Sequence, residues 1–338
     1  MKQSSFYSSI LGRPVFPNFI SCMRAVLLIL TLPTLLSFSL LPSSPASWAD
    51  GVAITPRYAG SAPAHRLAAA GHVAFASMFS YPDGVAVGPH NTVYVVDTDN
   101  TAVLKVGPAG NVSSLANAGF TYPTGIAVDS SGTVYVADAG TRSIKKISAR
   151  GELSSLAANA FTYPAGVAAA PDGTLYVVDA GSGAAAGVVK KISPTGHVST
   201  LASGFNKPSG VAVATDGTVY VADTDNNSIK KISPDGTIAV VAAEGLAKPR
   251  GVAVDAAGTL YIADTYNNSV RKILPAGNVV SLAQNLAYPS GIAIDAAGAV
   301  YVTDTGHAAL KKISPSGDIS TLADSSTVTA ASMHLGKN

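Results

Sequence analysis

The sequence contains two landmarks that return together at a nearly constant spacing. The pattern Pro-x-Gly-Val/Ile-Ala begins six times, and the gaps between successive prolines are 41, 41, 44, 41 and 40 residues. The pattern Tyr-Val/Ile-x-Asp also begins six times, with identical gaps. Two independent landmarks in one register indicate six repeated units. The prolines are Pro82, Pro123, Pro164, Pro208, Pro249 and Pro289, and the tyrosines are Tyr94, Tyr135, Tyr176, Tyr220, Tyr261 and Tyr301.

Each unit has the pattern of four short strands. In the second unit these are residues 125–129, 133–138, 143–148 and 152–157, which are rich in Val, Ile, Tyr and Thr and are separated by turn residues. Three residues before the repeated tyrosine stands a glycine, or Asn91 in the first unit. These residue types tolerate the positive φ that a tight hairpin needs.

Six four-stranded units of this length predict an all-β, six-bladed β-propeller of antiparallel blades. A single blade cannot bury both of its faces, whereas a closed ring of blades can, and the strands are apolar on both sides. A flat solenoid is the alternative, but no terminal unit has the polar character of a cap.

The repeat resembles the NHL repeat. The likeness rests on Pro-x-Gly-Val-Ala-Val, then Gly-Thr-Val/Leu-Tyr-Val/Ile-Ala-Asp-Thr, then Asn-Asn-Ser, with residues 208–233 and 249–274 as the best copies. It extends over residues 71–323, and it is similar to sensor-type NHL domains of exported bacterial proteins and receptor kinases. The resemblance implies the propeller fold. It does not select a function, because NHL-type propellers include sensors, scaffolds, RNA-binding domains and lyases.

The N-terminus has the pattern of a secretory signal peptide over residues 1–49. An uncharged run over residues 25–41 follows Arg24, and small residues precede a cleavage site predicted after Ala49. Met23 is a possible alternative start, and an uncleaved membrane anchor is the competing interpretation. We expect residues 50–70 to be a linker and residues 324–338 a tail. The predicted location is secreted or periplasmic, with no membrane span after cleavage and no packing of the leader against the blades.

The charge of the exported part disfavours nucleic-acid binding. Residues 50–338 contain 19 basic and 20 acidic residues, so their net charge is −1. The one cysteine, Cys22, lies in the leader, which leaves the mature chain without disulfides or thiol chemistry. We expect a monomer without a cofactor.

Residues repeated in every unit are expected to serve the fold. The aspartates that end each second strand are expected to accept hydrogen bonds from their own turns rather than bind a cation. The tyrosines of the second strands are expected in the core. The lysine pairs of the third strands are expected to cover apolar surface with their stems while their ammonium groups reach water.

Residues that differ between units are the better candidates for a binding site. The loops after strands two and four open on one face, and there tyrosines and basic residues accumulate, which is the composition of a recognition surface. We predict a protein, peptide or glycan partner with an acidic group, held off-axis over the fourth and fifth blades by an exposed basic patch of Lys207, Lys248 and Arg250. The candidate residues are Tyr122, Arg142, Tyr163, Lys207, Lys248, Arg250, Tyr266, Tyr288 and His307.

The alternative function is a metal-dependent propeller enzyme, a lyase or lactonase, with its site at the central channel. Histidine is scarce, and we cannot assemble three converging ligands from His90, His197 and His307. Glu152 and Glu244, the two glutamates of the chain, both fall outside the inner strands.

Two segments compete to close the ring. Residues 72–79 precede Pro82 as each fourth strand precedes its proline, so we expect them to become the fourth strand of the blade that begins at Pro289. The rival is residues 318–323, which can pair locally through a hairpin.

Overall fold

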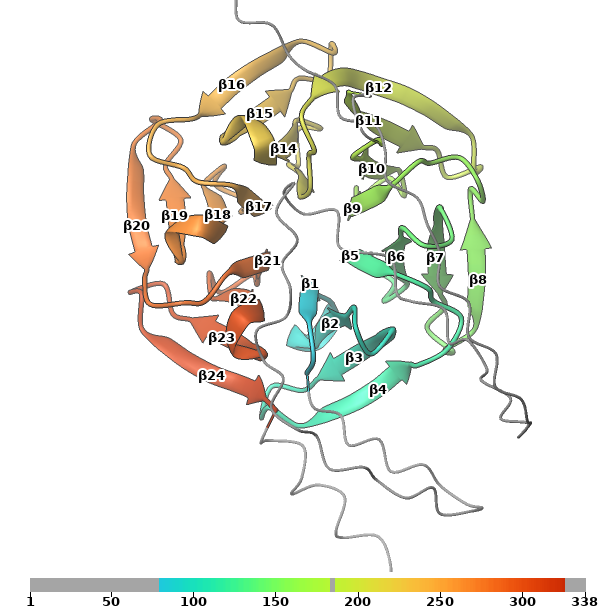
Figure 1. Cartoon of the computed structure of the whole chain (residues 1–338), viewed down its shortest axis with the longest axis horizontal. Helices are drawn as coiled ribbons and strands as arrows, with labels where there is room; N and C mark the ends of the chain where they lie inside the picture. The colour runs from blue at the N-terminus through green and yellow to red at the C-terminus, as the bar shows by residue number, and fades with distance from the viewer. Residues whose placement is uncertain (1–78, 183–185, 326–338) are drawn as a thin grey trace, which may run out of the picture. The chain divides into compact units, whose positions relative to one another are not determined.

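The computed structural model describes residues 79–182 and 186–325. In these residues 24 strands form six separate four-stranded antiparallel sheets. The sheets stand as blades around a common axis (Figure 1), which confirms the six-bladed propeller. The predicted signal peptide, the linker and the tail beyond residue 325 lie outside the described residues. No described helix is both long enough and apolar enough to cross a membrane.

Each blade runs outward from the axis in chain order, beginning with the innermost strand (Figure 1). The first strands are β1 (Pro82–Val87), β5 (Pro123–Val128), β9 (Pro164–Ala169), β13 (Val211–Val213), β17 (Pro249–Val254) and β21 (Pro289–Ile294). The second strands are β2 (Val93–Asp97), β6 (Val134–Asp138), β10 (Leu175–Asp179), β14 (Val219–Asp223), β18 (Leu260–Asp264) and β22 (Val300–Asp304).

The outer half of each blade consists of its third and fourth strands. The third strands are β3 (Ala102–Val106), β7 (Ser143–Ile147), β11 (Gly187–Ile192), β15 (Ser228–Ile232), β19 (Ser269–Ile273) and β23 (Ala309–Ile313). The fourth strands are β4 (Val112–Ala116), β8 (Leu153–Leu156), β12 (Val198–Phe205), β16 (Ile238–Ala242), β20 (Val279–Ala283) and β24 (Ile319–Asp324).

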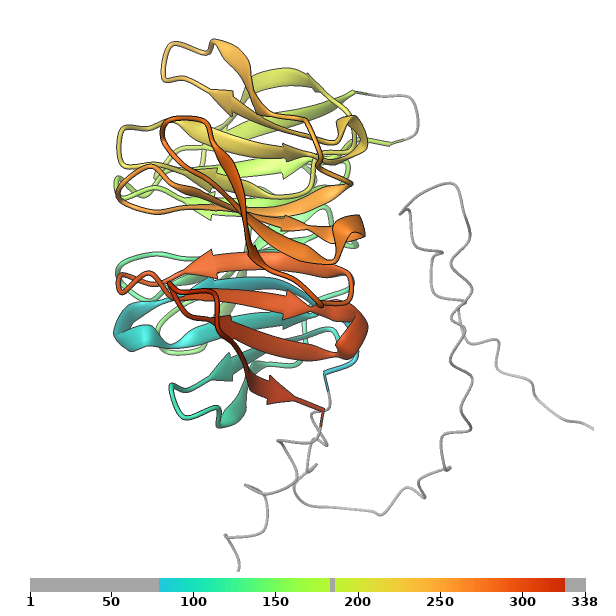
Figure 2. The same ribbon diagram turned by 90° about the vertical axis from the view of Figure 1, so that its left-hand side faces the viewer.

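The loops of the propeller gather on two opposite faces (Figure 2). We call the face formed by the loops after strands two and four the upper face. It carries the short 3-10 turns η2 (Thr224–Asn226), η3 (Thr265–Asn267) and η4 (Thr305–His307). The fourth short turn, η1 (Pro89–Asn91), joins strands one and two on the other face.

The apolar core lies between neighbouring blades. One cluster, for example, joins Tyr94 and Val96 of the first blade to Ile126 and Val134 of the second. Tyr94, Tyr135, Tyr261 and Tyr301 are buried in such interfaces, as the sequence predicted for the second strands. Tyr176 and Tyr220 are only half-buried, packed against the corresponding clusters. This arrangement explains why the strands are apolar on both sides, because each blade has two neighbours to cover it.

The glycine of Pro-x-Gly is required by the packing around the axis. A Cβ at Gly291 would lie closer than 3.0 Å to the carbonyl oxygen of Asp83 in the next blade. The same clash with the following blade recurs at every copy of the motif. The six positions are Gly84, Gly125, Gly166, Gly210, Gly251 and Gly291. The inner strands therefore pack backbone against backbone, which a side chain would prevent.

The repeated aspartates are structural, but their main partner differs from the one expected. Asp97 accepts hydrogen bonds from the backbone N–H of Ser80 at 3.1 Å and of Tyr81 at 2.9 Å, so it fixes the segment that enters its own blade. Asp223 accepts from the N–H of Asn206 at 2.6 Å in the same way. The expected bonds within the turn are present as well, such as that from the Asn226 amide to Asp223 at 2.8 Å.

Two lysines of the third strands, Lys190 and Lys230, depart from the expectation that the ammonium groups reach water, whereas Lys146 and Lys231 are exposed as expected. Lys190 lies 3.0 Å from Asp179, and Lys230 lies 2.6 Å from Asp223. Their side chains are only 19% and 18% exposed. The difference arises because the buried carboxylate of strand two attracts the neighbouring ammonium group, and this charge-assisted contact outweighs hydration.

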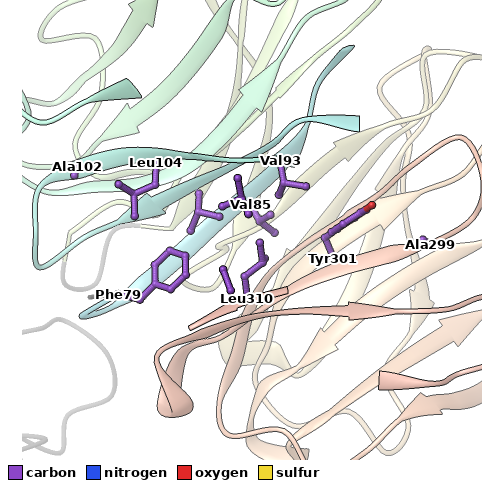
Figure 3. Close-up of a cluster of buried hydrophobic side chains, with 11 residues drawn as sticks. Phe79, Val85, Val93, Ala102, Leu104, Ala299, Tyr301 and Leu310 are labelled. Atoms are coloured by element: carbon purple, nitrogen blue, oxygen red, sulfur yellow. The ribbon is translucent and has the colours of Figure 1, made fainter. Parts of the chain in front are cut away.

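The ring closes through the alternative segment, residues 318–323, which forms a local hairpin. Strand β24 pairs with β23 through Leu310–Ala323 and Ile313–Ile319, and it fills the fourth position of the last blade. The expectation that residues 72–79 take this position is therefore wrong, because the local hairpin already occupies it; residues 72–78 lie outside the described part. Phe79 and Val85 pack in one buried cluster with Tyr301 and Leu310 of the last blade (Figure 3).

Candidate functional site

The first strands converge at the axis and enclose a hollow of about 110 Å³. Its lining includes the residue between Pro and Gly in each copy of the motif, so six positions form a ring. The repeat fixes the backbone of this ring but not its side chains, which differ from blade to blade. The six residues are Asp83, Thr124, Ala165, Ser209, Arg250 and Ser290. We call this hollow the axial pocket.

The hydroxyl groups of the ring hold neighbouring blades together. Thr124 Oγ1 donates to the carbonyl oxygen of Pro164 at 3.2 Å, and Ser209 Oγ donates to that of Arg250 at 2.8 Å. Ser290 Oγ donates to Asp83 Oδ1. These hydroxyls are therefore engaged in structural bonds, and the charged groups of the ring are Asp83 and Arg250.

Arg250 presents the positive charge of the axial pocket. Its Nη1 donates to the phenol oxygen of Tyr81 at 3.3 Å, and its Nη2 lies 3.7 Å from Asp83 Oδ1. Burial opposes ionisation of Arg250, but the nearby Asp83 and Tyr81 outweigh it and raise the pKa of the guanidinium. The group is therefore charged at any physiological pH. At 3.7 Å the pair is longer than a direct hydrogen bond, so the guanidinium is not clamped by Asp83.

Two tyrosines complete the wall of the pocket opposite this cation. The rings of Tyr122 and Tyr163 lie with centroids 6.3 Å apart and planes at 52°. Burial is the main cause that raises the pKa of both phenols, and the charge of Asp83 adds to it. Both side chains are therefore neutral hydrogen-bond donors near pH 7, and their rings give the pocket a rigid apolar wall.

The structure brings together three of the residues proposed from sequence, namely Tyr122, Tyr163 and Arg250. It also adds Tyr81 and Asp83, which the sequence argument missed. A signal for Tyr81 was present, because it precedes Pro82 just as Tyr122 precedes Pro123. Asp83 could have been found from the variation at the position between Pro and Gly.

The predicted basic patch does not form as expected. Lys207 and Lys248 both contact Asp225, at 3.2 and 3.0 Å, so a carboxylate offsets their charge. Arg250 instead lines the axial pocket. The side chains of Lys248 and Arg250 are 31% and 29% exposed, so the expectation that both are exposed is wrong. The reason is that Lys248 pairs with Asp225 on the upper face, whereas Arg250 is directed into the axial pocket, where Tyr81 and Asp83 lie beside it.

The other proposed residues lie on the upper face outside the axial pocket. Tyr266 and Tyr288 form an edge-to-face pair with ring centroids 5.8 Å apart. His307 lies 2.8 Å from Asp304 through Nδ1, and its side chain is 56% exposed. Arg142 is exposed and has a φ of 53°. These residues do not converge with Arg250.

Residues 79–182 and 186–325 contain no ligand set for a metal ion. Within these ranges no three side chains of His, Cys, Asp or Glu lie close enough together to hold a metal ion. The residues that line the axial pocket include one carboxylate, Asp83, and no histidine.

The comparison with protein families decides what kind of propeller this is. The model of the virginiamycin B lyase family matches residues 69–330, which is most of the chain. The chain belongs to the virginiamycin B lyase family. The NHL-like repeat seen in the sequence is thus the repeat of a related propeller family. A comparison with curated proteins finds no match.

Solved structures resemble this member of the virginiamycin B lyase family in fold. A catalytically inactive histidine-to-alanine variant of virginiamycin B lyase from Staphylococcus aureus, with quinupristin, is 17% identical; the match covers 75% of this chain and 87% of that one, with a TM-score of 0.56. A gluconolactonase from Xanthomonas campestris is 20% identical over 72% and 87% of the two chains, with a TM-score of 0.60. A chain of a nidogen/laminin complex is 18% identical over 71% and 91%, with a TM-score of 0.59.

At these identities the likeness concerns the fold alone, and these folds serve both catalysis and binding. The chemistry of this family member must therefore be argued from its own pocket.

Proposed function

We propose that the axial pocket binds the carboxylate of a ligand and that Arg250 is its anchor. The observation that carries this proposal is a charged guanidinium in a hollow at the propeller axis, 29% exposed and held by Asp83 only at 3.7 Å. A carboxylate can accept two parallel N–H bonds from one guanidinium, and such charge-assisted pairs are stronger than neutral hydrogen bonds. Asp83 keeps its bond from Ser290 when Arg250 turns toward the ligand.

The size of the pocket limits what it encloses. Pockets that bury a whole small molecule measure roughly 300–1,000 Å³, whereas this hollow measures about 110 Å³. It therefore accommodates the acidic group, while the rest of the ligand lies on the upper face. Tyr122 and Tyr163 flank the opening, where their phenols donate hydrogen bonds and their rings cover apolar parts of the ligand.

This site revises the position expected from sequence while keeping its chemistry. The acidic group of the partner was expected off-axis over the fourth and fifth blades. The position of Arg250 favours the axis instead, because the lysines of that region already share Asp225.

Binding of paired acids and amides tests the proposal. Calorimetric titration of the propeller with benzoate and with benzamide should show binding of the acid only. Arg250→Ala should weaken binding of benzoate at least tenfold, as expected for loss of about 1.5–3 kcal/mol from a charged hydrogen bond. Arg142→Ala, on the same face but outside the pocket, is the matched control. Equal binding of acid and amide, or wild-type affinity in Arg250→Ala, would contradict the proposal.

A second candidate function is a lyase, favoured by the match to the virginiamycin B lyase family over residues 69–330. In this candidate Asp83 accepts a proton from the carbon next to a carbonyl group, and the electron pair of that C–H bond forms a C=C bond to the neighbouring carbon. The C–O ester bond of the neighbouring carbon breaks, and its electron pair leaves on the ester oxygen, which becomes the carboxylate of the product. Arg250 stabilises the negative charge that develops. The acceptor is thus a residue that already receives a hydrogen bond from Ser290.

Mass spectrometry after incubation with quinupristin tests this candidate. Elimination that opens a ring leaves the total mass unchanged, whereas hydrolysis adds one water. A product of unchanged mass but new retention time, lost in Asp83→Asn, would support the lyase. Recovery of unaltered quinupristin, or a product one water heavier, would contradict it, and neither result affects the binding of benzoate.

A further inference from the structure

Two neighbouring blade junctions share one backbone arrangement but present different side chains. At the junction of the fourth and fifth blades, the N–H of Lys248 donates to Asn227 Oδ1 at 2.8 Å. At the next junction, the N–H of Tyr288 donates to Asn268 Oδ1 at 3.0 Å. Lys248 and Tyr288 even share their left-handed backbone, with φ of 47° and 49°. The two junctions therefore serve as an internal comparison within one chain.

The side chains at these junctions differ in chemistry. The first junction pairs Lys248 with Asp225 at 3.0 Å. The second places Tyr288 beside Tyr266, with ring centroids 5.8 Å apart and planes at 86°. The same backbone arrangement is compatible with an ion pair at one junction and with two tyrosines at the other. The fold therefore does not require the tyrosines.

The tyrosine pair is also poorly placed to stabilise the core. Tyr266 and Tyr288 are 44% and 55% exposed. Among the large hydrophobic residues that are exposed in the described part of the chain, these two are the aromatic ones. Exposed tyrosines that lie side by side offer rigid area with polar tips, which suits a ligand more than a core.

A polar hollow of about 550 Å³ adjoins the pair through Asn268. It lies between the turn before β19 and the end of β20. Amide groups dominate its wall, and an amide can both donate and accept hydrogen bonds. The Nδ2 group of Asn267 already donates to the carbonyl oxygen of Gly245 and to Asp264, each at 2.8 Å, so this residue meets a ligand as an acceptor through Oδ1. The polar lining includes Asn267, Asn268, Arg271, Ser281, Gln284 and Asn285.

The hollow is electrically neutral despite its arginine. Arg271 Nε lies 2.7 Å from Asp264 Oδ2, and this aspartate is fully buried. The guanidinium is thus committed to a structural pair and offers no net attraction for an anion. This property separates the hollow from the axial pocket, where Arg250 is held at 3.7 Å.

We propose that the tyrosine pair and the amide-lined hollow form a binding site for a neutral oligosaccharide. The apolar C–H faces of a sugar ring pack on tyrosine rings, while its hydroxyl groups exchange hydrogen bonds with amides that can serve as either donor or acceptor. The volume lies within the range of pockets that bury a small molecule, and so accommodates a few sugar units. The site is independent of the axial pocket.

Titration with three neutral oligosaccharides tests the site. The full propeller is titrated calorimetrically with chitohexaose, cellohexaose and maltohexaose, and at least one of them should bind. Tyr266→Ala and Tyr288→Asn should each weaken that binding at least tenfold. Asparagine is chosen at Tyr288 because it tolerates the positive φ of this position.

The neighbouring junction supplies the control. Lys248→Asn occupies the equivalent position one blade earlier, and it should leave oligosaccharide binding unchanged. Melting curves of all variants confirm that they are folded. The proposal is overturned if wild type binds none of the three sugars, if the tyrosine variants retain wild-type affinity, or if Lys248→Asn causes the same loss. Preference for polygalacturonate over these sugars would also overturn it, because that ligand is anionic.

Discussion

Thr305 Oγ1 donates a hydrogen bond to the carbonyl oxygen of Pro82 at 2.7 Å, which joins the last blade to the first across 223 residues of chain. The same bond connects blades that follow one another directly. Thr265 Oγ1 donates to the carbonyl oxygen of Pro289 at 2.8 Å. The ring thus closes with the contact that it uses between consecutive blades, but without a covalent connection at that place.

The closing bond should matter more for local opening than its equivalents. Thr305→Val removes a buried donor and leaves the Pro82 carbonyl without it, which should cost about 1–3 kcal/mol. Thr265→Val should cost a similar amount in global stability. Hydrogen exchange of β1 and β22 should accelerate more in Thr305→Val, because the chain does not connect the last blade to the first. Equal exchange in the two variants would show that closure is not the weak point of the ring.

The glycine ring predicts a strong effect of a single methyl group. Gly291→Ala places a Cβ against the backbone carbonyl of Asp83, which cannot rotate away, so the inner strands must separate. We expect a loss of about 2–4 kcal/mol in urea denaturation, comparable to other severe overpacking. Gly107→Ala is the control, because the atoms nearest to its Cβ belong to the side chain of Asn111, which can move. Similar midpoints for the two variants would refute this account of the motif.

Arg250 should contribute to stability as well as to binding. Arg250→Ala removes the partner of Asp83 and the donor to Tyr81, which should lower the unfolding free energy by about 1–2 kcal/mol. Arg142→Ala, at an exposed position, should change it by less than about 0.5 kcal/mol. Chemical denaturation measures both. An unchanged midpoint in Arg250→Ala would mean that the pocket charges are solvated rather than paired.

The tyrosines of the second strands predict loss of stability in alkali. Burial and the neighbouring carboxylates of Asp129, Asp255 and Asp295 raise the pKa of Tyr135, Tyr261 and Tyr301 from 10.0 to about 12. A raised phenol pKa means that the folded state favours the protonated form. The contribution is therefore fully present below pH 10 and is lost as the pH rises through about 12.

Unfolding free energy measured at a series of pH values checks this dependence. Tyr261→Phe, which loses the 3.2 Å bond from its hydroxyl group to Asp255, should show a shallower decline above pH 10 than wild type. Tyr288→Phe, at an exposed site, should decline as wild type does. If wild type is equally stable on both sides of this window, the tyrosine–aspartate pairs do not contribute as described.

The repeat was sufficient to predict the fold because strand patterns and turn residues agreed in all six units. Gly132 and its equivalents do adopt positive φ, and so does Asn91, where the first unit lacks the glycine. The closing strand was mispredicted for a physical reason. The sequence of residues 72–79 matches the position of a fourth strand, but a local hairpin forms β24 with less loss of chain entropy.

The candidate site was only partly predictable. Tyr122, Tyr163 and Arg250 were found because they differ between units at repeated positions. Their convergence at the axis was not predictable, since it depends on the direction in which strand one enters the ring. The pairing of Lys207 and Lys248 with Asp225 was also hidden, because Asp225 belongs to a turn in which this position carries different residues, such as Tyr266 and Gly306 in the next two blades.

The junction asparagines have a consequence for how such chains diversify. Asn227 and Asn268 hold the following segment by its backbone N–H, so neither depends on which side chain that segment carries. Duplicated blades can therefore exchange the residues at these positions without disturbing their neighbours. A protein engineer could use the same sockets to graft new pairs of side chains, one blade at a time, onto a ring that is already closed.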